Sequence, residues 1–176
     1  MTGVQTCALP ISQVGAVIGR EFSYGLLHAV LPLPEDELQA ALAKLADAEL
    51  IYTRGLAPEA TYQFKHALIQ DAAYEALLKS KRRELHARVA QTLSETFAAL
   101  VDAQPQLLAR HWSDAGEAEP AIAAWIKAAK AAEVRSAFKE AEGGYRQALA
   151  NLSTLPESPE RDAREMEVVI ALAPVL

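Results

Sequence analysis

A run of apolar residues at helical spacing is the feature that most constrains the fold of this chain. Leu85, Val89, Leu93, Phe97 and Leu100 follow one another at steps of four or three, which places them on one face of an α-helix. Alanine, a strong helix former, makes up about a fifth of the 176 residues, whereas aromatic residues make up 6%. The sequence therefore predicts a mostly α-helical protein with closely packed helices.

Charge and cysteine content exclude several classes of protein. The chain has 17 Lys and Arg against 23 Asp and Glu, a formal net charge of −6, and one cysteine, Cys7. A single cysteine cannot form a disulfide framework or a zinc site with two or more cysteine ligands. The acidic balance disfavours a dedicated nucleic-acid-binding protein, because the binding face of such a protein is basic.

The first twelve residues, MTGVQTCALPIS, differ from the rest of the chain. They carry no charge and no helical or strand period, and they lack the basic start and long apolar run of a secretory signal. Residues 1–11 resemble the translated sequence of a common sequencing adapter. We therefore expect residues 1–12 to be a disordered artefact fused to native sequence. The alternative is a disordered native N-terminus.

Residues 13–79 show the element order of a winged helix whose first helix is truncated. A short apolar stretch, 13–19, is followed by a predicted helix over 22–31 and by another that begins at Pro34. Two runs rich in β-formers, 50–53 and 61–64, flank a turn-like loop. We therefore predict three helices followed by a two-stranded wing, which must pack on the helices to be stable.

Residues 80–176 are predicted to be helical, with breaks at Pro105, at Gly116 and between Pro156 and Pro159. A short pattern occurs twice: Ala121, Trp125 and Ala128 recur as Ala141, Tyr145 and Ala148. The pattern resembles the later half of a tetratricopeptide repeat, although its copies are more closely spaced than full repeats. The last predicted helix, 160–173, carries an apolar face of Val168, Val169 and Leu172 that nothing downstream covers. We therefore expect the native protein to continue beyond Leu176.

Motifs for catalysis or metal binding are not found in the sequence. It contains no G-x-x-x-x-G-K-[ST] and no G-x-G-x-x-G, so no glycine-rich loop can hold phosphates. The four histidines, His28, His66, His86 and His111, are scattered and lack metal-ligand spacing. We predict that this chain is not an enzyme, has no metal site and binds no cofactor alone.

Charge also bears on DNA binding, which a winged helix suggests. The third helix, 34–49, would enter the major groove, yet it carries five acidic residues against Lys44 alone. A negative helix opposes binding to phosphates. The basic run of Lys79, Lys81, Arg82, Arg83 and Arg88 is interrupted by Glu84 and is typical of a solvated helix face. DNA is therefore a disfavoured partner.

Three stretches together resemble one family of signalling proteins. They are AVIGREFSYGLL (16–27), LPEDELQAALAKLADAELIYTRG (33–55) and ATYQFKHALIQDAAYEALLKSKRRELHARVA (60–90). They resemble the region after the nucleotide-binding domain in large bacterial STAND-type ATPases, many of which carry an adenylate/guanylate cyclase or protein kinase domain. The resemblance implies that the winged helix packs on the upstream ATPase in its ADP-bound resting state. It also implies that the helical repeats bind a protein or small-molecule ligand.

The resemblance points to one site residue, His66. In related STAND proteins a Met-His-Asp motif closes the winged helix, and its histidine approaches the β-phosphate of ADP. His66 occupies the equivalent place, although Ala67 stands where the motif has Asp. An imidazole can donate a hydrogen bond to a phosphate oxygen. The alternative is that His66 only caps or packs at the strand–helix junction.

Three functional hypotheses follow. The first is a cytoplasmic, non-catalytic regulatory fragment of a STAND ATPase, with ADP or ATP bound by the parent protein and no contact with a membrane. The second is a fragment of a winged-helix transcriptional regulator that binds DNA. The third is a helical protein-interaction scaffold without any link to nucleotides.

Overall fold

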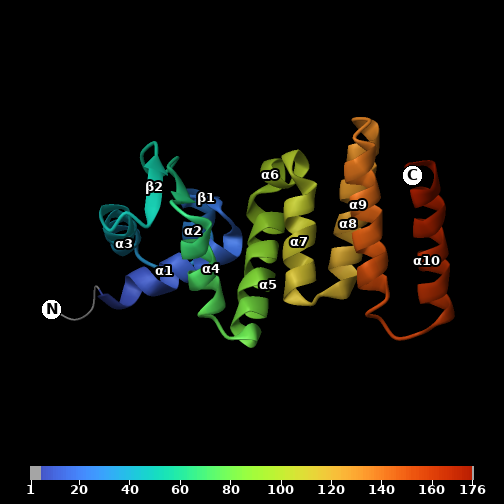
Figure 1. Cartoon of the computed structure of the whole chain (residues 1–176), viewed down its shortest axis with the longest axis horizontal. Helices are drawn as coiled ribbons and strands as arrows, with labels where there is room; N and C mark the ends of the chain where they lie inside the picture. Colours follow the sequence, from blue (N-terminus) through green and yellow to red (C-terminus); the bar gives the residue numbers. More distant parts are fainter. Residues whose placement is uncertain (1–4, 176) are drawn as a thin grey trace. The chain divides into compact units, whose positions relative to one another are not determined.

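The computed structural model describes residues 5–175, which are mostly helical with a small antiparallel sheet (Figure 1). The mostly α fold class predicted from the sequence is therefore confirmed. The chain forms two compact units, one ending at Thr92 and the other beginning at Leu93. This division falls inside helix α5 (Lys79–Thr96), whereas the change of organisation predicted at residue 79 coincides with the start of that helix.

The first unit alternates helices with short strands. Its elements before α5 are α1 (Gln5–Ile18), β1 (Glu21–Ser23), α2 (Tyr24–Val30), α3 (Glu35–Asp47), β2 (Ile51–Arg54), β3 (Thr61–Phe64) and α4 (Ala67–Glu75). Helix α3 follows Pro34 as predicted, and its first turn exposes Glu35, Asp36 and Glu37. Carboxylates at this end interact favourably with the helix dipole.

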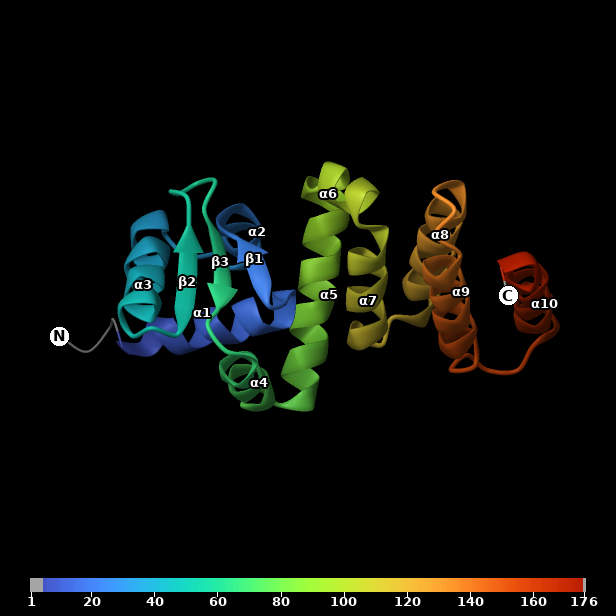
Figure 2. The same ribbon diagram turned by 45° about the horizontal axis from the view of Figure 1, so that its top comes forward.

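The sheet has three strands in the order β1-β3-β2, which lie side by side in Figure 2. Both ladders are antiparallel, with Phe22 opposite Tyr62 and Ile51 opposite Phe64. The two strands predicted from the sequence are therefore joined by a third, β1, and the helix predicted from residue 22 begins at Tyr24. Ser23 provides the reason, because its Oγ accepts a hydrogen bond from the Leu26 amide at 3.2 Å and caps the helix. The residues before it are left extended and pair with β3.

The N-terminal segment was predicted to be disordered, but residues 5–12 form the first turns of α1. Residues 1–4 lie outside the described part of the chain, as does the side chain of Cys7. Ile11 and Val14 are buried, three positions apart on one face of the helix. The prediction of disorder for residues 5–12 was wrong because it rested on the absence of charge and periodicity up to Ser12. The apolar face becomes visible only when the residues after Ser12 are included.

Aromatic rings fill the core between the sheet and α1. The Phe22 ring lies 5.8 Å from the Tyr62 ring and 5.7 Å from the Phe64 ring, measured between centroids. A Cβ at Gly15 would lie 2.8 Å from the Phe22 ring, so glycine at this position lets α1 approach the sheet. Such ring contacts stabilise a core beyond the area they bury.

A buried tyrosine gives a test of this core. The Tyr24 side chain is 2% exposed, and within the described chain its hydroxyl has no hydrogen-bond partner. We expect Tyr24→Phe to leave the free energy of unfolding unchanged or to raise it by about 1 kcal/mol, because an uncompensated desolvation penalty is removed. Urea denaturation followed by circular dichroism measures the change. A loss of more than about 1 kcal/mol would contradict an unpaired hydroxyl.

Arg82 holds the turn between α4 and α5. Its guanidinium donates to both carboxylate oxygens of Glu75, at 3.3 and 2.8 Å, and to the main-chain oxygens of Glu75 and Leu77. It also stacks on the Tyr74 ring at 4.6 Å, and the Tyr74 hydroxyl lies 3.1 Å from Nε2 of the buried His86. A planar guanidinium suits this combination of stacking and forked hydrogen bonds.

The second unit consists of helices. Its elements after α5 are α6 (Ala98–Ala103), α7 (Pro105–Ala115), α8 (Ala118–Val134), α9 (Phe138–Leu152), α10 (Pro159–Leu172) and a short 3₁₀ turn, η1 (Ala173–Val175). The helix predicted to run to residue 100 is interrupted at Phe97, whose backbone has φ −117° and ψ 45°. Gly116 ends α7 with a left-handed conformation at φ 81°, as a glycine at a helix C-terminus commonly does.

Helices α8, α9 and α10 share one hydrophobic core, and α8 and α9 lie side by side in both ribbon views. The recurring positions of α9, Ala141, Tyr145 and Ala148, lie in this core, whereas in α8 Ala121 and Ala128 are buried and Trp125 packs against the core. On α10 the predicted apolar face is only partly open, because Val168 and Leu172 pack into the core while Val169 is 45% exposed. Among residues 5–175 no helix is long and apolar enough to cross a membrane.

Candidate functional site

His66 lies at the junction between the last strand and α4, as the sequence predicted. It is the residue before the first turn of α4, with extended backbone angles of φ −132° and ψ 143°. Its side chain is exposed and makes no capping hydrogen bond to the helix. The His66 carbonyl accepts a hydrogen bond from the Ile69 amide at 3.1 Å, so the backbone of His66, and not its imidazole, takes part in the start of α4. An exposed imidazole at this position remains accessible to another molecule or domain.

The neighbouring cation is already neutralised. Lys65 Nζ lies 2.7 Å from the Glu49 carboxylate and 5.7 Å from the centre of the Tyr52 ring. Their hydrogen bond lowers the pKa of Glu49 and raises the pKa of Lys65. Because the Lys65 ammonium forms an ion pair with Glu49, its charge is already balanced. An anionic ligand at this junction would therefore contact mainly the His66 imidazole.

The helix that follows His66 is fixed to α1. The Gln70 side-chain amide donates to the main-chain oxygen of Ala16 at 3.2 Å, across two elements far apart in sequence. At the other side of the junction, the Lys65 amide donates to the Leu50 carbonyl at 3.0 Å. The position of His66 is therefore set by hydrogen bonds on both sides of it.

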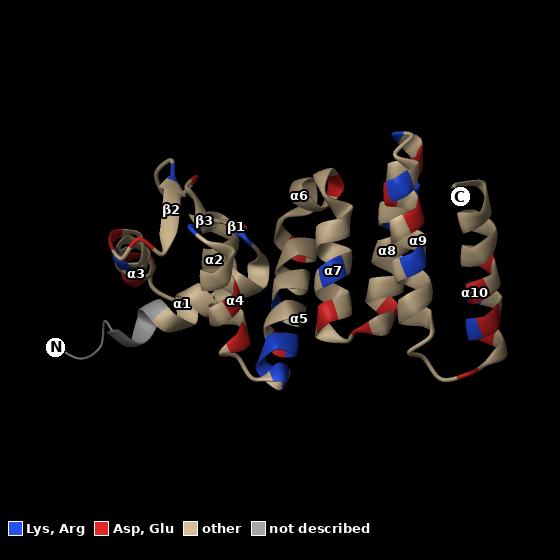
Figure 3. Cartoon of the chain, in the orientation of Figure 1, with Lys and Arg blue, Asp and Glu red and all other residues tan. Residues whose placement is uncertain are grey.

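The other histidines do not join His66 in a cluster. His28 lies on α2 and is exposed, whereas His86 on α5 and His111 on α7 are buried. Within the described residues, no group of three or more His, Cys, Asp or Glu side chains is placed to hold a metal ion. The basic run at the start of α5 is visible in Figure 3, and three of its members form ion pairs with Glu75 or Glu84.

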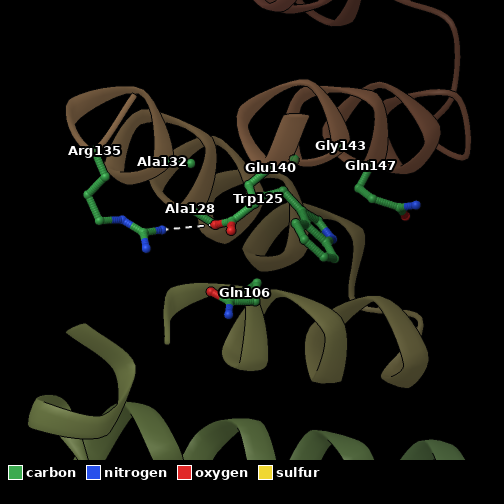
Figure 4. Close-up of a pocket in the computed structure, with 9 residues that line it drawn as sticks. Gln106, Trp125, Ala128, Ala132, Arg135, Glu140, Gly143 and Gln147 are labelled. Carbon is green, nitrogen blue, oxygen red and sulfur yellow. Dashed lines mark hydrogen bonds and ion pairs between the residues drawn. The ribbon is translucent and has the colours of Figure 1, made fainter. Parts of the chain in front are cut away.

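A cavity in the second unit was not predicted from the sequence. It has a volume of about 340 Å³ and lies among α7, α8 and α9 (Figure 4). Trp125, Ala128 and Ala132 of α8 line it, together with Gly143 and Gly144 of α9. Polar side chains at its edge are Gln106, Arg135, Glu140 and Gln147. A cavity of this size is typical of a site for a small molecule or a short chain segment.

Hydrogen bonds hold the indole of Trp125 in place. Its Nε1 donates to Ser113 Oγ at 2.8 Å, and the Asn151 amide donates to the same oxygen at 3.1 Å. Ser113 in turn donates to the Ala109 carbonyl at 3.1 Å. One serine hydroxyl therefore joins α7, α8 and α9. The adjacent pair Gly143-Gly144 is unusual inside a predicted helix, since glycine weakens a helix, but it does not by itself indicate a cavity.

Comparison with known proteins gives one similar sequence. An uncharacterized protein of Rhizobium meliloti (strain 1021) is 34% identical over 175 residues, a match that covers 96% of this chain and 16% of that protein. The chain thus spans a small part of the length of the curated relative it matches. No family model matches the chain, and no solved structure matches it.

Proposed function

We propose that this chain is a regulatory region of a larger STAND-type signalling ATPase, in which a winged helix is followed by tetratricopeptide-like helices. The observation that carries the proposal is the order α1-β1-α2-α3-β2-β3 with a three-stranded sheet, followed in the same chain by packed helix pairs. The first part is the element order of a winged helix. The third strand, which the sequence did not predict, supports this assignment better than a lone hairpin would.

The length of the similar protein supports a role within a larger chain. That protein is about six times as long as the matched region, since the match covers 16% of it. A nucleotide-binding domain and an effector domain would lie outside the matched part. In this proposal the region transmits the nucleotide state of the parent protein and has no catalytic activity of its own.

Charge on the first unit favours this role over binding to DNA. Helix α3, which would be the recognition helix, exposes Glu35, Asp36, Glu37 and Asp47 and carries Lys44 as its basic residue (Figure 3). Counterion release, which drives binding to DNA, requires positive charge at this surface. An acidic α3 is instead suited to contact with a basic protein surface.

His66 is the proposed contact with the nucleotide of the parent protein. In the intact protein, we expect His66→Ala to increase the rate of ADP release about tenfold or more, because a hydrogen bond to a charged group contributes about 1.5–3 kcal/mol. ADP retained through purification, released by denaturation and quantified by chromatography, measures the effect. His28→Ala, which changes an exposed histidine of the same unit, serves as the control. Equal retention of ADP in the two variants and the native protein would rule out the sensor role.

A further inference from the structure

The cavity among α7, α8 and α9 combines an apolar floor with a neutral polar edge. The Trp125 ring and the methyl groups of Ala128 and Ala132 form the floor. At one end Arg135 and Glu140 neutralise each other across 3.1 Å, a pair drawn as a dashed line in Figure 4. The lining therefore favours a ligand without net charge.

Gly143 lines the cavity at a helix position where glycine lowers stability. Glycine in a helix interior destabilises the helix by about 0.5–1 kcal/mol relative to alanine. A Cβ at Gly143 would have no atom within 4 Å, so packing does not require glycine there. The neighbouring Gly144 differs, because its Cβ would lie 3.0 Å from Ala129 Cβ. Gly143 therefore contributes to the cavity lining without a side chain, at a position where a side chain would meet no other atom.

The cavity edge offers amide groups from opposite sides. Gln106 belongs to α7 and Gln147 to α9, and Figure 4 shows their amides on opposite sides of the Trp125 ring, pointing away from each other. Their side-chain amides are exposed and make no hydrogen bond to any residue between 5 and 175. A primary amide both donates and accepts, which matches the N–H and C=O of another amide.

We infer that this cavity binds an uncharged ligand in which an amide group lies next to a compact apolar group. The apolar group rests on Trp125, and the ligand amide pairs with Gln106 or with Gln147, which lie on opposite sides of that ring. The ring is held in place by Ser113, so binding needs little rearrangement. This inference rests on the proposed function, because it specifies the ligand of the helical region to which that function assigns a regulatory role. Both a free small molecule and a peptide segment carry this chemistry.

The test uses the full 176-residue chain labelled with ¹⁵N and the probe N-acetyl-L-leucine amide. The indole N–H signal of Trp125 is expected to shift saturably with a dissociation constant on the order of a few mM, as expected for a ligand of this size. The indole of Trp112, which does not line the cavity, is an internal control. Acetyl-Ala-Ala-Leu-Ala-Ala-amide is the second probe. Binding of the peptide at least tenfold tighter indicates a peptide ligand, and equal binding indicates a free small molecule.

Variants separate this site from other surfaces of the chain. Gly143→Leu places a side chain in the cavity and is expected to weaken binding at least tenfold without loss of stability. Ala150→Leu adds similar bulk to an exposed position of the same helix and should bind as the native chain does. Gln106→Leu combined with Gln147→Leu tests the amide contacts and should also weaken binding tenfold.

Three results would overturn the inference. They are no saturable shift of the Trp125 signal with either probe, undiminished binding to Gly143→Leu, and equally strong binding of 3-methylbutan-1-ol, which has no amide. If these titrations fail, the result expected for ADP retention in the His66 variant does not change. If instead ADP retention is unchanged in that variant, the results expected for the titrations do not change. The two proposals can therefore be rejected independently of each other.

Discussion

Gly144→Val is expected to destabilise the second unit by about 1–3 kcal/mol, the usual cost of overpacking a well-packed contact. A Cβ at Gly144 would lie 3.0 Å from the Cβ, 3.2 Å from the Cα and 3.3 Å from the main-chain nitrogen of Ala129. Two of these atoms belong to the backbone of α8, so the two helices must separate to admit a side chain. Urea denaturation followed by the fluorescence of Trp112 and Trp125, both within this unit, measures the change.

The adjacent glycine provides a matched control for this prediction. Gly143→Ala is expected to raise the free energy of unfolding by about 0.5–1 kcal/mol, because the added methyl group meets no atom and alanine favours a helix. The two substitutions therefore change stability in opposite directions at consecutive positions. If Gly144→Val were as stable as the native chain, the close approach of α8 and α9 would be incorrect.

Stability is expected to fall steeply between pH 10 and pH 12 because of Tyr145. This side chain is 1% exposed, and burial together with the Glu133 carboxylate raises its pKa to about 12. Below pH 10 the phenol is protonated in both the folded and the unfolded chain, so it adds no pH dependence. Above pH 10 the unfolded chain loses this proton while the folded chain keeps it. The unfolded state is then favoured by up to about 2–3 kcal/mol at pH 12.

Tyr145→Phe isolates this effect from the titration of other groups. The variant keeps the ring in the core but has no proton to lose, so its stability should decline less between pH 10 and pH 12. The measurement is the difference between the two proteins in free energy of unfolding at each pH, obtained from urea denaturation. Parallel pH profiles for the two proteins would show that Tyr145 has an ordinary pKa in the folded chain.

Local sequence signals predicted many helices and strands of this fold, but they did not predict which strands, far apart in the sequence, pair with each other. Pro34 and the carboxylates after it marked the start of α3, and Gly116 marked the end of α7, because these signals act within a single turn. Strand β1 was missed because three residues show no clear period and because its partner lies about forty residues further along the chain. Its pairing depends on the edge of β3, a strand that no residue near β1 indicates.

The candidate sites differ in how far the sequence could predict them. The position of His66 between a strand and a helix followed from local patterns and is confirmed, whereas its contact with a nucleotide stays a prediction. The cavity could not be predicted, because Gln106, Trp125 and Gln147 come together only when three helices pack. Spacing within one helix carries no information on the distance between helices.

The central position of β3 has a consequence for folding during synthesis. Both neighbours of β3 precede it in the chain, and β1 and β2 pair with β3 rather than with each other. A nascent chain that has not yet released residues 61–64 from the ribosome therefore has two strands without a partner. Both ladders close when this one segment emerges, so we expect the sheet to form in a single late step, after contacts of high sequence separation become possible.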